Sequence, residues 1–149
     1  MNAISGMTNL YKTAHDQERR AYCLDKIEEA SVHLLGVIND ILDMSKIEAG
    51  KMELSFSEFN FEKMLVRVTN VLNYSISQKQ QVFHVKTDDH LPALLYSDEQ
   101  RISQVITNLL ANAVKFTPAG GEITLRVSLV AERDDSCTIE VAVKDNGIG

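Results

Sequence analysis

The strongest constraint on the fold is a long run of helical spacing that extends from about Glu18 to about Glu48. Its recurring positions lie three and four residues apart, which is the spacing of a supercoiled helical seam. These positions are Leu24, Ile27, Ser31, Leu34, Ile38, Ile41, Ser45 and Glu48, with Leu35 and Leu42 beside them. Roughly 30 residues at 1.5 Å each give a helix about 45 Å long. One short preceding helix cannot cover this length, so the exposed remainder of the seam needs a partner.

A shorter helical pattern precedes the long one and predicts a helical hairpin. Residues 2–12 place Ile4, Met7 and Leu10 on one stripe, and the polar residues 13–17 connect the two patterns. Such a hairpin would bury both stripes by pairing with a second copy in a four-helix bundle. The alternative is a long helix that lies along a globular domain of its own chain. We expect a homodimer formed through the hairpin.

The spacing changes at Lys51, which we take as the boundary between two domains, residues 1–50 and residues 51–149. Gly50 is a typical helix stop, because glycine readily adopts the left-handed conformation that ends many helices. After it, residues 52–56 alternate between apolar and polar side chains and predict a short strand.

The remaining residues predict a layer of helices packed on a sheet. We expect helices at 61–77 and 98–117, and strands at 82–87, 94–96, 123–129 and 139–143. Apolar residues alternate in the last two strands, which form a hairpin around a turn at 134–136. Strands covered on both faces would be apolar throughout, so the alternation indicates helices on one face and water on the other. The predicted fold class is α+β, a helical hairpin followed by an α/β layer.

Composition and charge exclude several classes of function. The chain has 149 residues, a formal net charge of −6 and no run of Lys and Arg, so we expect no nucleic-acid partner. Cys23 and Cys137 lie too far apart for a zinc motif, and they indicate a reducing, cytoplasmic setting. No apolar run is long enough to cross a bilayer. We expect no membrane contact in this stretch, although a parent protein could carry a membrane anchor.

The helix expected at 98–117 carries polar side chains that an ordinary buried helix does not need. Asn108 and Asn112 lie one turn apart, and Lys115 and Phe116 follow them at the helix end. Carboxamide oxygens can join a Mg²⁺ shell, an ammonium group can bind phosphate, and an aromatic ring can cover a base. The alternative is that these residues are solvated polar positions of an amphipathic helix. The set predicts a site for a nucleotide triphosphate and its metal.

A second group of candidate residues follows the last expected strand. Asp145 stands at the strand end, and Gly147 and Gly149 come after it. A carboxylate there can accept a hydrogen bond from an exocyclic amine such as that of adenine, and glycines allow the backbone to turn tightly beside a ligand. The alternative for this pattern on its own is a plain turn. We expect Asp145 and Asn112 to line opposite walls of one cavity.

Four segments of the chain resemble the sensor histidine kinases, especially the hybrid kinases of two-component phosphorelays. Residues 108–117 are similar to their N box, and residues 145–149 are similar to their G1 box. Residues 41–50 resemble the junction between the dimerisation hairpin and the catalytic domain, and residues 1–7 resemble the stretch just after the H box. The segments occur in the order and at the spacing of the family, and together they span nearly the whole chain.

The resemblance implies a role for each candidate residue of the helix. It implies that Asn112 is a Mg²⁺ ligand and that Asn108 lies near the metal and the phosphates as a candidate second ligand. Lys115 would contact phosphate. Phe116, where the family often has tyrosine, would pack beside the adenine. The implied cofactors are therefore ATP and Mg²⁺.

The same resemblance extends to the opposite wall of the pocket and to the fold. Asp145 would read the adenine amine, while Gly147 and Gly149 would shape the pocket and the start of a lid. The catalytic domain would be an α/β sandwich of the Bergerat (GHKL) type, shared with gyrase-like and MutL-like ATPases. In this chain the sandwich would be cut short after the G1 box.

The resemblance also implies the reaction and the partners of a parent kinase. Such an enzyme transfers the γ-phosphoryl group of ATP to a histidine on the hairpin, and then to an aspartate on a receiver domain of a response regulator or of the same hybrid kinase. The acceptor histidine would precede Met1, and the lid and the second glycine box would follow Gly149. No H-box neighbours surround the histidines of this chain, which are His15, His33, His84 and His90. We interpret them as ordinary residues and expect this chain alone to be inactive and to bind nucleotide weakly.

Two other functions are compatible with the same residues. The chain could be a dimerisation and scaffold module with a non-functional nucleotide site. The candidate residues argue against this because all are intact, namely Asn108, Asn112, Lys115 and Asp145. It could also belong to another ATPase of the superfamily, which commonly has glutamate at the position of Asn108 to activate water. Because asparagine cannot take that proton, transfer to a protein acceptor fits better than hydrolysis.

Overall fold

The computed structural model describes residues 2–14 and 16–148, without the side chains of Asn2, Ala3 and Asp40. The sequence-based interpretations of Met1, His15 and Gly149 therefore lie outside the described residues. The chain separates into two compact units, Met1–Glu53 and Leu54–Gly149, and each is described by itself.

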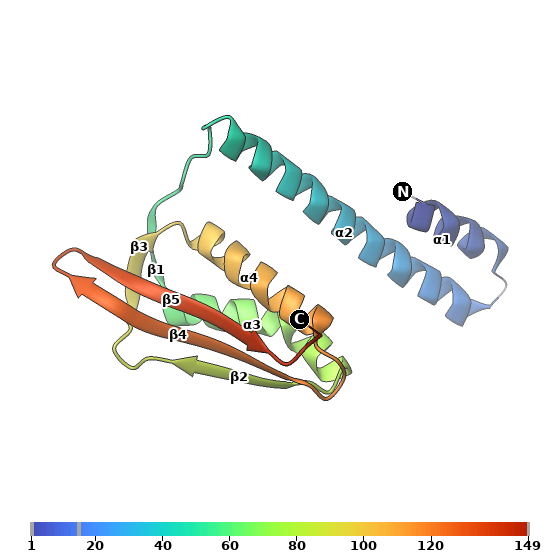
Figure 1. The fold of residues 1–149 in the computed structure, drawn as a ribbon. Coiled ribbons are helices and arrows are strands. Elements are labelled where there is room, and N and C mark those ends of the chain that lie inside the picture. The colour runs from blue at the N-terminus through green and yellow to red at the C-terminus, as the bar shows by residue number, and fades with distance from the viewer. Residues whose placement is uncertain (1, 15, 149) are drawn as a thin grey trace. The chain divides into compact units, whose positions relative to one another are not determined.

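The first unit is a helical hairpin of α1 (Asn2–Thr13) and α2 (Gln17–Glu48), which pack against each other (Figure 1). The carboxylate of Asp16 caps α2 by accepting a hydrogen bond from the backbone N–H of Glu18. At the other end of α2, Gly50 has a φ of 63°, a conformation that glycine adopts at little cost. Both predicted helices are confirmed.

The hairpin buries only a small part of its apolar surface. Cys23 is 2% exposed and Ala14 is 5% exposed. Most of the large apolar side chains of α2 are exposed, namely Tyr22, Leu24, Val32, Leu34, Leu35, Val37, Ile38, Ile41, Leu42, Met44 and Ile47. Despite this apolar face, no described helix is both long enough and apolar enough to span a membrane.

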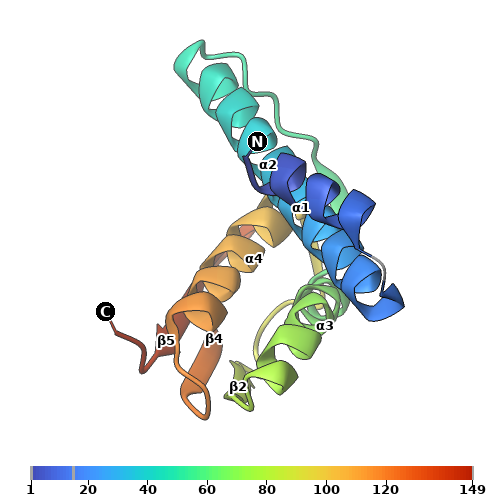
Figure 2. The ribbon, with the colours of Figure 1, turned by 90° about the vertical axis from the view of Figure 1, so that its right-hand side faces the viewer.

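The second unit is a sheet with helices on one face (Figures 1 and 2). Its main sheet has the order β2-β4-β5 and contains β2 (Val82–Thr87), β4 (Glu122–Arg133) and β5 (Ser136–Asp145). β2 runs parallel to β4, whereas β5 runs antiparallel to it. The helices are α3 (Phe61–Gln78) and α4 (Glu99–Phe116). A small antiparallel sheet pairs β1 (Ser57–Asn60) with β3 (Leu94–Ser97).

The strand predicted at 52–56 is wrong, because those residues have no regular structure and β1 begins at Ser57. Alternation shows that a segment can be a strand, but a strand also needs a partner with free backbone groups. The partner strand ends at Ser97, and the N–H of Ser55 donates instead to the carboxylate of Asp98. The other predicted helices and strands of this unit are confirmed.

The core lies between β4 and the two helices. Ile123, Leu125 and Val127 alternate along β4 with polar residues that are half-buried or exposed, and each of the three is at most 1% exposed. Met64 of α3 and Leu110 of α4 have no exposed surface and belong to the same cluster. One face of the sheet is therefore covered by helices, as the alternation predicted.

Asp98 fixes the start of α4. Its Oδ1 accepts a hydrogen bond from the backbone N–H of Arg101 at 2.9 Å, and its Oδ2 accepts one from the N–H of Ser55 at 2.9 Å. These bonds, the one from Arg101 first, hold the pKa of the Asp98 carboxyl below its ordinary value. The carboxylate thus caps the helix and anchors the segment before β1 at the same time.

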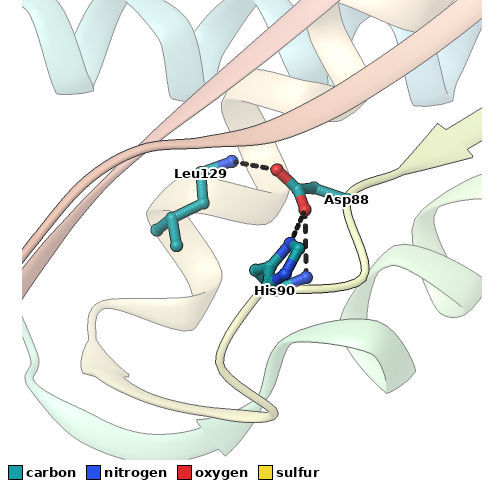
Figure 3. A network of polar contacts seen from close by, with 3 residues as sticks. All are labelled: Asp88, His90 and Leu129. Atoms are coloured by element: carbon teal, nitrogen blue, oxygen red, sulfur yellow. Dashed lines mark hydrogen bonds and ion pairs between the residues drawn. The ribbon is translucent and has the colours of Figure 1, made fainter.

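A second aspartate, Asp88, holds the turn between β2 and β3 by hydrogen bonds (Figure 3). Oδ1 of Asp88 accepts a hydrogen bond from the backbone N–H of His90 at 3.0 Å and lies 2.9 Å from the ring Nδ1 of that residue. Its Oδ2 lies 3.4 Å from the backbone N–H of Leu129, beside the irregularity of β4 between Leu129 and Ala131. The bonds from His90 lower the pKa of Asp88. His90 therefore helps to hold this turn.

The two bonds to Asp98 make stability depend on pH. A carboxyl whose pKa is lowered by folding stabilises the folded state fully above its unfolded pKa, which is about 4. That contribution is lost as the pH falls through the lower pKa of the folded state.

We expect Asp98→Asn to be less stable than the wild type near pH 7, with a difference that shrinks below about pH 4. Urea unfolding at a series of pH values measures this difference. Asp134→Asn, at an exposed position, is the control. A difference in unfolding free energy between Asp98→Asn and the wild type that persists in acid would contradict this role of the Asp98 carboxylate.

Candidate functional site

The ends of α4 and β5 enclose an open hollow of about 430 Å³. The residues that line it are Leu109, Asn112, Ala113, Phe116, Val143, Asp145 and Ile148. The first four lie on one face of α4, because they are spaced three and four residues apart. The other residues come from the end of β5 and the segment after it. The helix α4 and the end of β5, which are distant in sequence, therefore supply opposite walls of the hollow.

The walls combine apolar and polar surface. Leu109, Ala113 and Val143 form the apolar part, while Asn112 and Asp145 contribute a carboxamide and a carboxylate. Phe116 is 49% exposed and Ile148 is 84% exposed, so the hollow opens to solvent. A planar ring with an amine at its edge fits this surface, because it can pack on the apolar part and donate to the carboxylate.

The segment after β5 is fixed close to the end of α4. The backbone N–H of Gly147 donates to Oδ1 of Asp145 at 2.8 Å. A Cβ atom at Gly147 would lie 2.6 Å from that oxygen and 2.8 Å from the carbonyl oxygen of Phe116. On the other side, Asn146 exchanges hydrogen bonds with the backbone of Glu122 at 2.8 and 3.2 Å. Glycine is therefore required for the close approach of this loop to α4.

The predicted site residues occupy three kinds of position. Asn112, Phe116 and Asp145 line the hollow, and Gly147 supports it from the loop. Asn108 and Lys115 are exposed on α4 and are not among the lining residues. The ammonium group of Lys115 lies 5.2 Å from the centre of the Phe116 ring. The roles of all these residues stay predictions.

Sequence reasoning missed the apolar part of the site. The apolar Leu109 stands beside the buried Leu110 in the sequence, but its side chain is 43% exposed and lines the hollow. Val143 and Ile148 were not considered as site residues. The signal for Leu109 was its spacing of three residues from Asn112, which places both on one face.

The donor set limits what kind of metal site this can be. Among the residues that the structure describes, no group of three or more His, Cys, Asp or Glu side chains could hold a metal. Mg²⁺ is often held by one or two protein oxygens, with water and substrate phosphates in its other positions. The exposed carboxamide of Asn112 fits that role.

Two family models match the chain. The model described as "His Kinase A (phospho-acceptor) domain" matches residues 1–50. The model described as "Histidine kinase-, DNA gyrase B-, and HSP90-like ATPase" matches residues 97–149. The second match contains α4, β4, β5 and the hollow between them.

Known relatives share similarity along the whole chain. The sensor histidine kinase GacS of Pseudomonas protegens is 37% identical over 149 residues, which make up 100% of this chain and 16% of GacS. The hybrid signal transduction histidine kinase L of Dictyostelium discoideum is 36% identical over 100% of this chain and 9% of its own length. The chain therefore spans only a small part of these relatives.

Solved structures of histidine kinases have a similar fold. The structure of full-length ShkA in complex with AMPPNP matches with a TM-score of 0.68 and 27% identity over 98% of this chain and 30% of that chain. AdeS of Acinetobacter baumannii matches with a TM-score of 0.70 over 98% of this chain and 69% of that chain. At 20% identity, AdeS supports the fold alone. The predicted order of a helical hairpin followed by an α/β layer is confirmed.

The contact of Gly147 with α4 can be tested by adding a single methyl group. We expect Gly147→Ala to displace the loop and to cost about 1–3 kcal/mol of stability, because the new Cβ overlaps Asp145 and Phe116. Urea unfolding and the amide chemical shifts of Phe116 and Asp145 measure both effects. Gly36→Ala is the control for the added methyl group, since nothing lies within 4 Å of a Cβ there, and inside α2 it should not lower stability. Equal stability and unchanged shifts in Gly147→Ala would rule out the contact.

Proposed function

The chain belongs to the sensor histidine kinase family, and we propose that its second unit provides the Mg-ATP site of a kinase that phosphorylates a histidine. The observation that carries the proposal is the hollow in which Asn112, Phe116 and Asp145 face one volume. These are the residues for which the N box and the G1 box imply contacts with the metal and the base. Because the chain spans a small part of its relatives, the activity of the whole protein is itself part of the proposal.

In this proposal the adenine enters the hollow between α4 and β5. One oxygen of Asp145 already accepts from the N–H of Gly147, which orients the carboxylate. The carboxylate can still accept a hydrogen bond from the exocyclic amine of adenine. The half-exposed ring of Phe116 covers the base, and the apolar part of the hollow excludes water from one face of it. ShkA, which has the same fold, is known in complex with the nucleotide analogue AMPPNP.

The carboxamide of Asn112 would hold Mg²⁺ at the edge of the same hollow. Asn108 lies one turn away on α4 and would serve as a second ligand when the phosphates are bound. Lys115 would bind phosphate. When bound, the metal would neutralise negative charge on the phosphates, and phosphoryl transfer depends on such electrostatic stabilisation together with positioning.

The proposed reaction is phosphoryl transfer to a protein nitrogen. The bond between the γ-phosphorus and its bridging oxygen breaks, ADP leaves, and a bond forms between phosphorus and a histidine ring nitrogen of a helical hairpin. The phosphoryl group then passes to an aspartate on the receiver domain of a response regulator or of the same hybrid kinase. Asparagine at position 108 supports transfer to protein rather than to water, because a carboxamide cannot act as a general base.

We further propose that these 149 residues bind nucleotide only weakly on their own and do not phosphorylate themselves. The hollow leaves Phe116 half-exposed and Ile148 largely exposed, so its walls cover only part of a nucleotide. None of the described histidines lines it. A cytoplasmic location is part of the same proposal, since ATP is supplied there and the two cysteines are free.

The first unit supports a homodimer, which is the second part of the proposed function. Ile41 and Leu42 are 60% and 53% exposed, and they belong to a longer apolar face of α2. A second copy of the hairpin would cover this face in a four-helix bundle. The match of residues 1–50 to the phospho-acceptor domain supports this arrangement.

The nucleotide site can be tested by NMR titration of the full chain, because chemical shifts report weak binding. We expect Mg-ATP to shift the amide signals of Asn112, Phe116, Asp145 and Gly147. In Asn112→Ala the Mg²⁺-dependent part of these shifts should disappear and the apparent affinity should fall at least about tenfold, since a metal ligand is lost.

The control for this titration is Asn70→Ala, which removes an exposed carboxamide from α3. Binding by Asn112→Ala that matches this control, or shifts confined to another surface, would refute the site. Micromolar affinity of the wild-type chain would refute the weak binding proposed for these residues alone.

The dimer can be tested by introducing a charge into the apolar face of α2. We expect Ile41→Glu to convert the chain from dimer to monomer, because a carboxylate buried in the bundle lacks a partner. Size-exclusion chromatography with light scattering measures the mass over a range of concentrations. The exposed Asn39→Glu is the control. A monomeric wild type at every concentration would argue against the dimer, as would a dimeric Ile41→Glu.

A further inference from the structure

Two side chains from outside α4 bind the backbone carbonyls at its C-terminal end. The ammonium group of Lys79 donates to the carbonyl oxygens of Val114 at 2.7 Å and of Lys115 at 2.9 Å, and it lies 3.4 Å from that of Thr117. The Nε2 group of Gln81 donates to Thr117 at 2.7 Å and to Val114 at 3.1 Å. The last carbonyls of a helix have no partners within the helix. Here Lys79 and Gln81 supply the missing donors.

The chain reverses sharply to place these two donors. Lys79 caps the end of α3, and Gln80 has a φ of 53°, which turns the backbone toward β2. Gln81 is 7% exposed, so leaving its Nε2 group without an acceptor would be costly, whereas its Oε1 has no hydrogen-bond partner among the described residues. The carbonyl oxygen of Lys79 also accepts a hydrogen bond from the N–H of Gly120 at 3.0 Å. The end of α3 and the turn after α4 are therefore held to each other through Lys79.

The charge of Lys79 matters as well as its hydrogen bonds. The C-terminal end of a helix carries a partial negative charge, and a cation there stabilises the helix. Under the proposed function, the last turns of α4 lie beside a polyphosphate, which a negative helix end would repel. Lys79 is bonded to the carbonyls of that end and offsets their charge.

The bound carbonyls lie within the segment that forms the site. Val114 and Lys115 stand between Asn112 and Phe116, which both line the hollow. The carbonyl of Phe116 in turn limits how closely the loop at Gly147 can approach. We infer that Lys79 is a positioning residue, which holds the last turn of α4 so that Asn112 and Phe116 face the hollow. The part of this inference that concerns nucleotide binding rests on the proposed function.

The test compares three lysine variants of the full chain. Lys79→Met removes the charge and the donors, Lys79→Arg keeps both, and Lys63→Met is the control because Lys63 is exposed on the same helix. In the absence of ligand, we expect Lys79→Met to shift the amide signals of Phe116 and Gly147 and to speed hydrogen exchange at Thr117. Lys63→Met should do neither. Lys79→Arg should restore most of the wild-type values.

The second measurement is the affinity for Mg-ATP, taken by NMR titration at a temperature where each variant is fully folded. We expect Lys79→Met to bind at least about fivefold more weakly than Lys63→Met, with recovery in Lys79→Arg, because displaced contact groups bind less well. A residue that only stabilises the fold would lower the melting temperature without changing this affinity. Equal affinity of the folded Lys79→Met and Lys63→Met variants would overturn the inference.

Two further outcomes separate the inference from the proposed function. If the wild-type chain shows no response to Mg-ATP, the proposed function fails, while the signals of Phe116 and Gly147 without ligand still decide whether Lys79 holds the helix end. If Lys79→Met does not fold, Lys79→Gln replaces it, since glutamine keeps a donor but loses the charge. Unchanged signals and affinity in Lys79→Gln would then overturn the inference.

Discussion

The carbonyl groups at the end of α4 need hydrogen-bond donors, and much of the second unit is arranged around supplying them. The donors come from Lys79 and Gln81, which lie between α3 and β2. Because Gln81 directly precedes β2, its bonds to the end of α4 also fix the start of the first strand of the main sheet. The connection between two helices and a sheet thus depends on a few polar contacts, of which those of Gln81 are buried and costly to leave unmade.

The two faces of α4 have different surroundings: one packs in the core, and the other lines the hollow. Leu110 and Ile106 point into the core, where they are almost fully covered by the sheet and α3. Asn112 and Phe116 are exposed and line the hollow beside Asp145. With Asp98 capping its first turn and Lys79 binding its last, α4 is held at both ends. A rigid element of this kind keeps exposed functional groups in place without burying them.

The two units supply different parts of the proposed kinase. The first has almost no buried core of its own, and its long helix carries an exposed apolar face along most of its length. Such a face is typical of a helix that is completed by a partner. The second has a closed core and an open hollow at the edge of it. In the proposed function, assembly and nucleotide binding therefore belong to separate parts of the chain.

The sequence by itself determined the elements that depend on local spacing. The period of the apolar residues predicted the helices, and the position of Asp145 after an alternating run placed it at a strand end. Helical geometry also placed Asn108 and Asn112 on one face. These features could be predicted because each follows from residues fewer than five positions apart.

Only the tertiary structure decided the contacts between distant segments. It placed the first strand of the second unit at Ser57 rather than at 52–56, because pairing depends on β3. It also placed Asn112, but not Asn108, in the lining of the hollow. Lys79 and Gln81 bind carbonyls that are 33 to 38 residues away, and no periodicity encodes such a distance. The spacing of residues determines local conformation, whereas packing and hydrogen bonding across the fold determine which side chains meet.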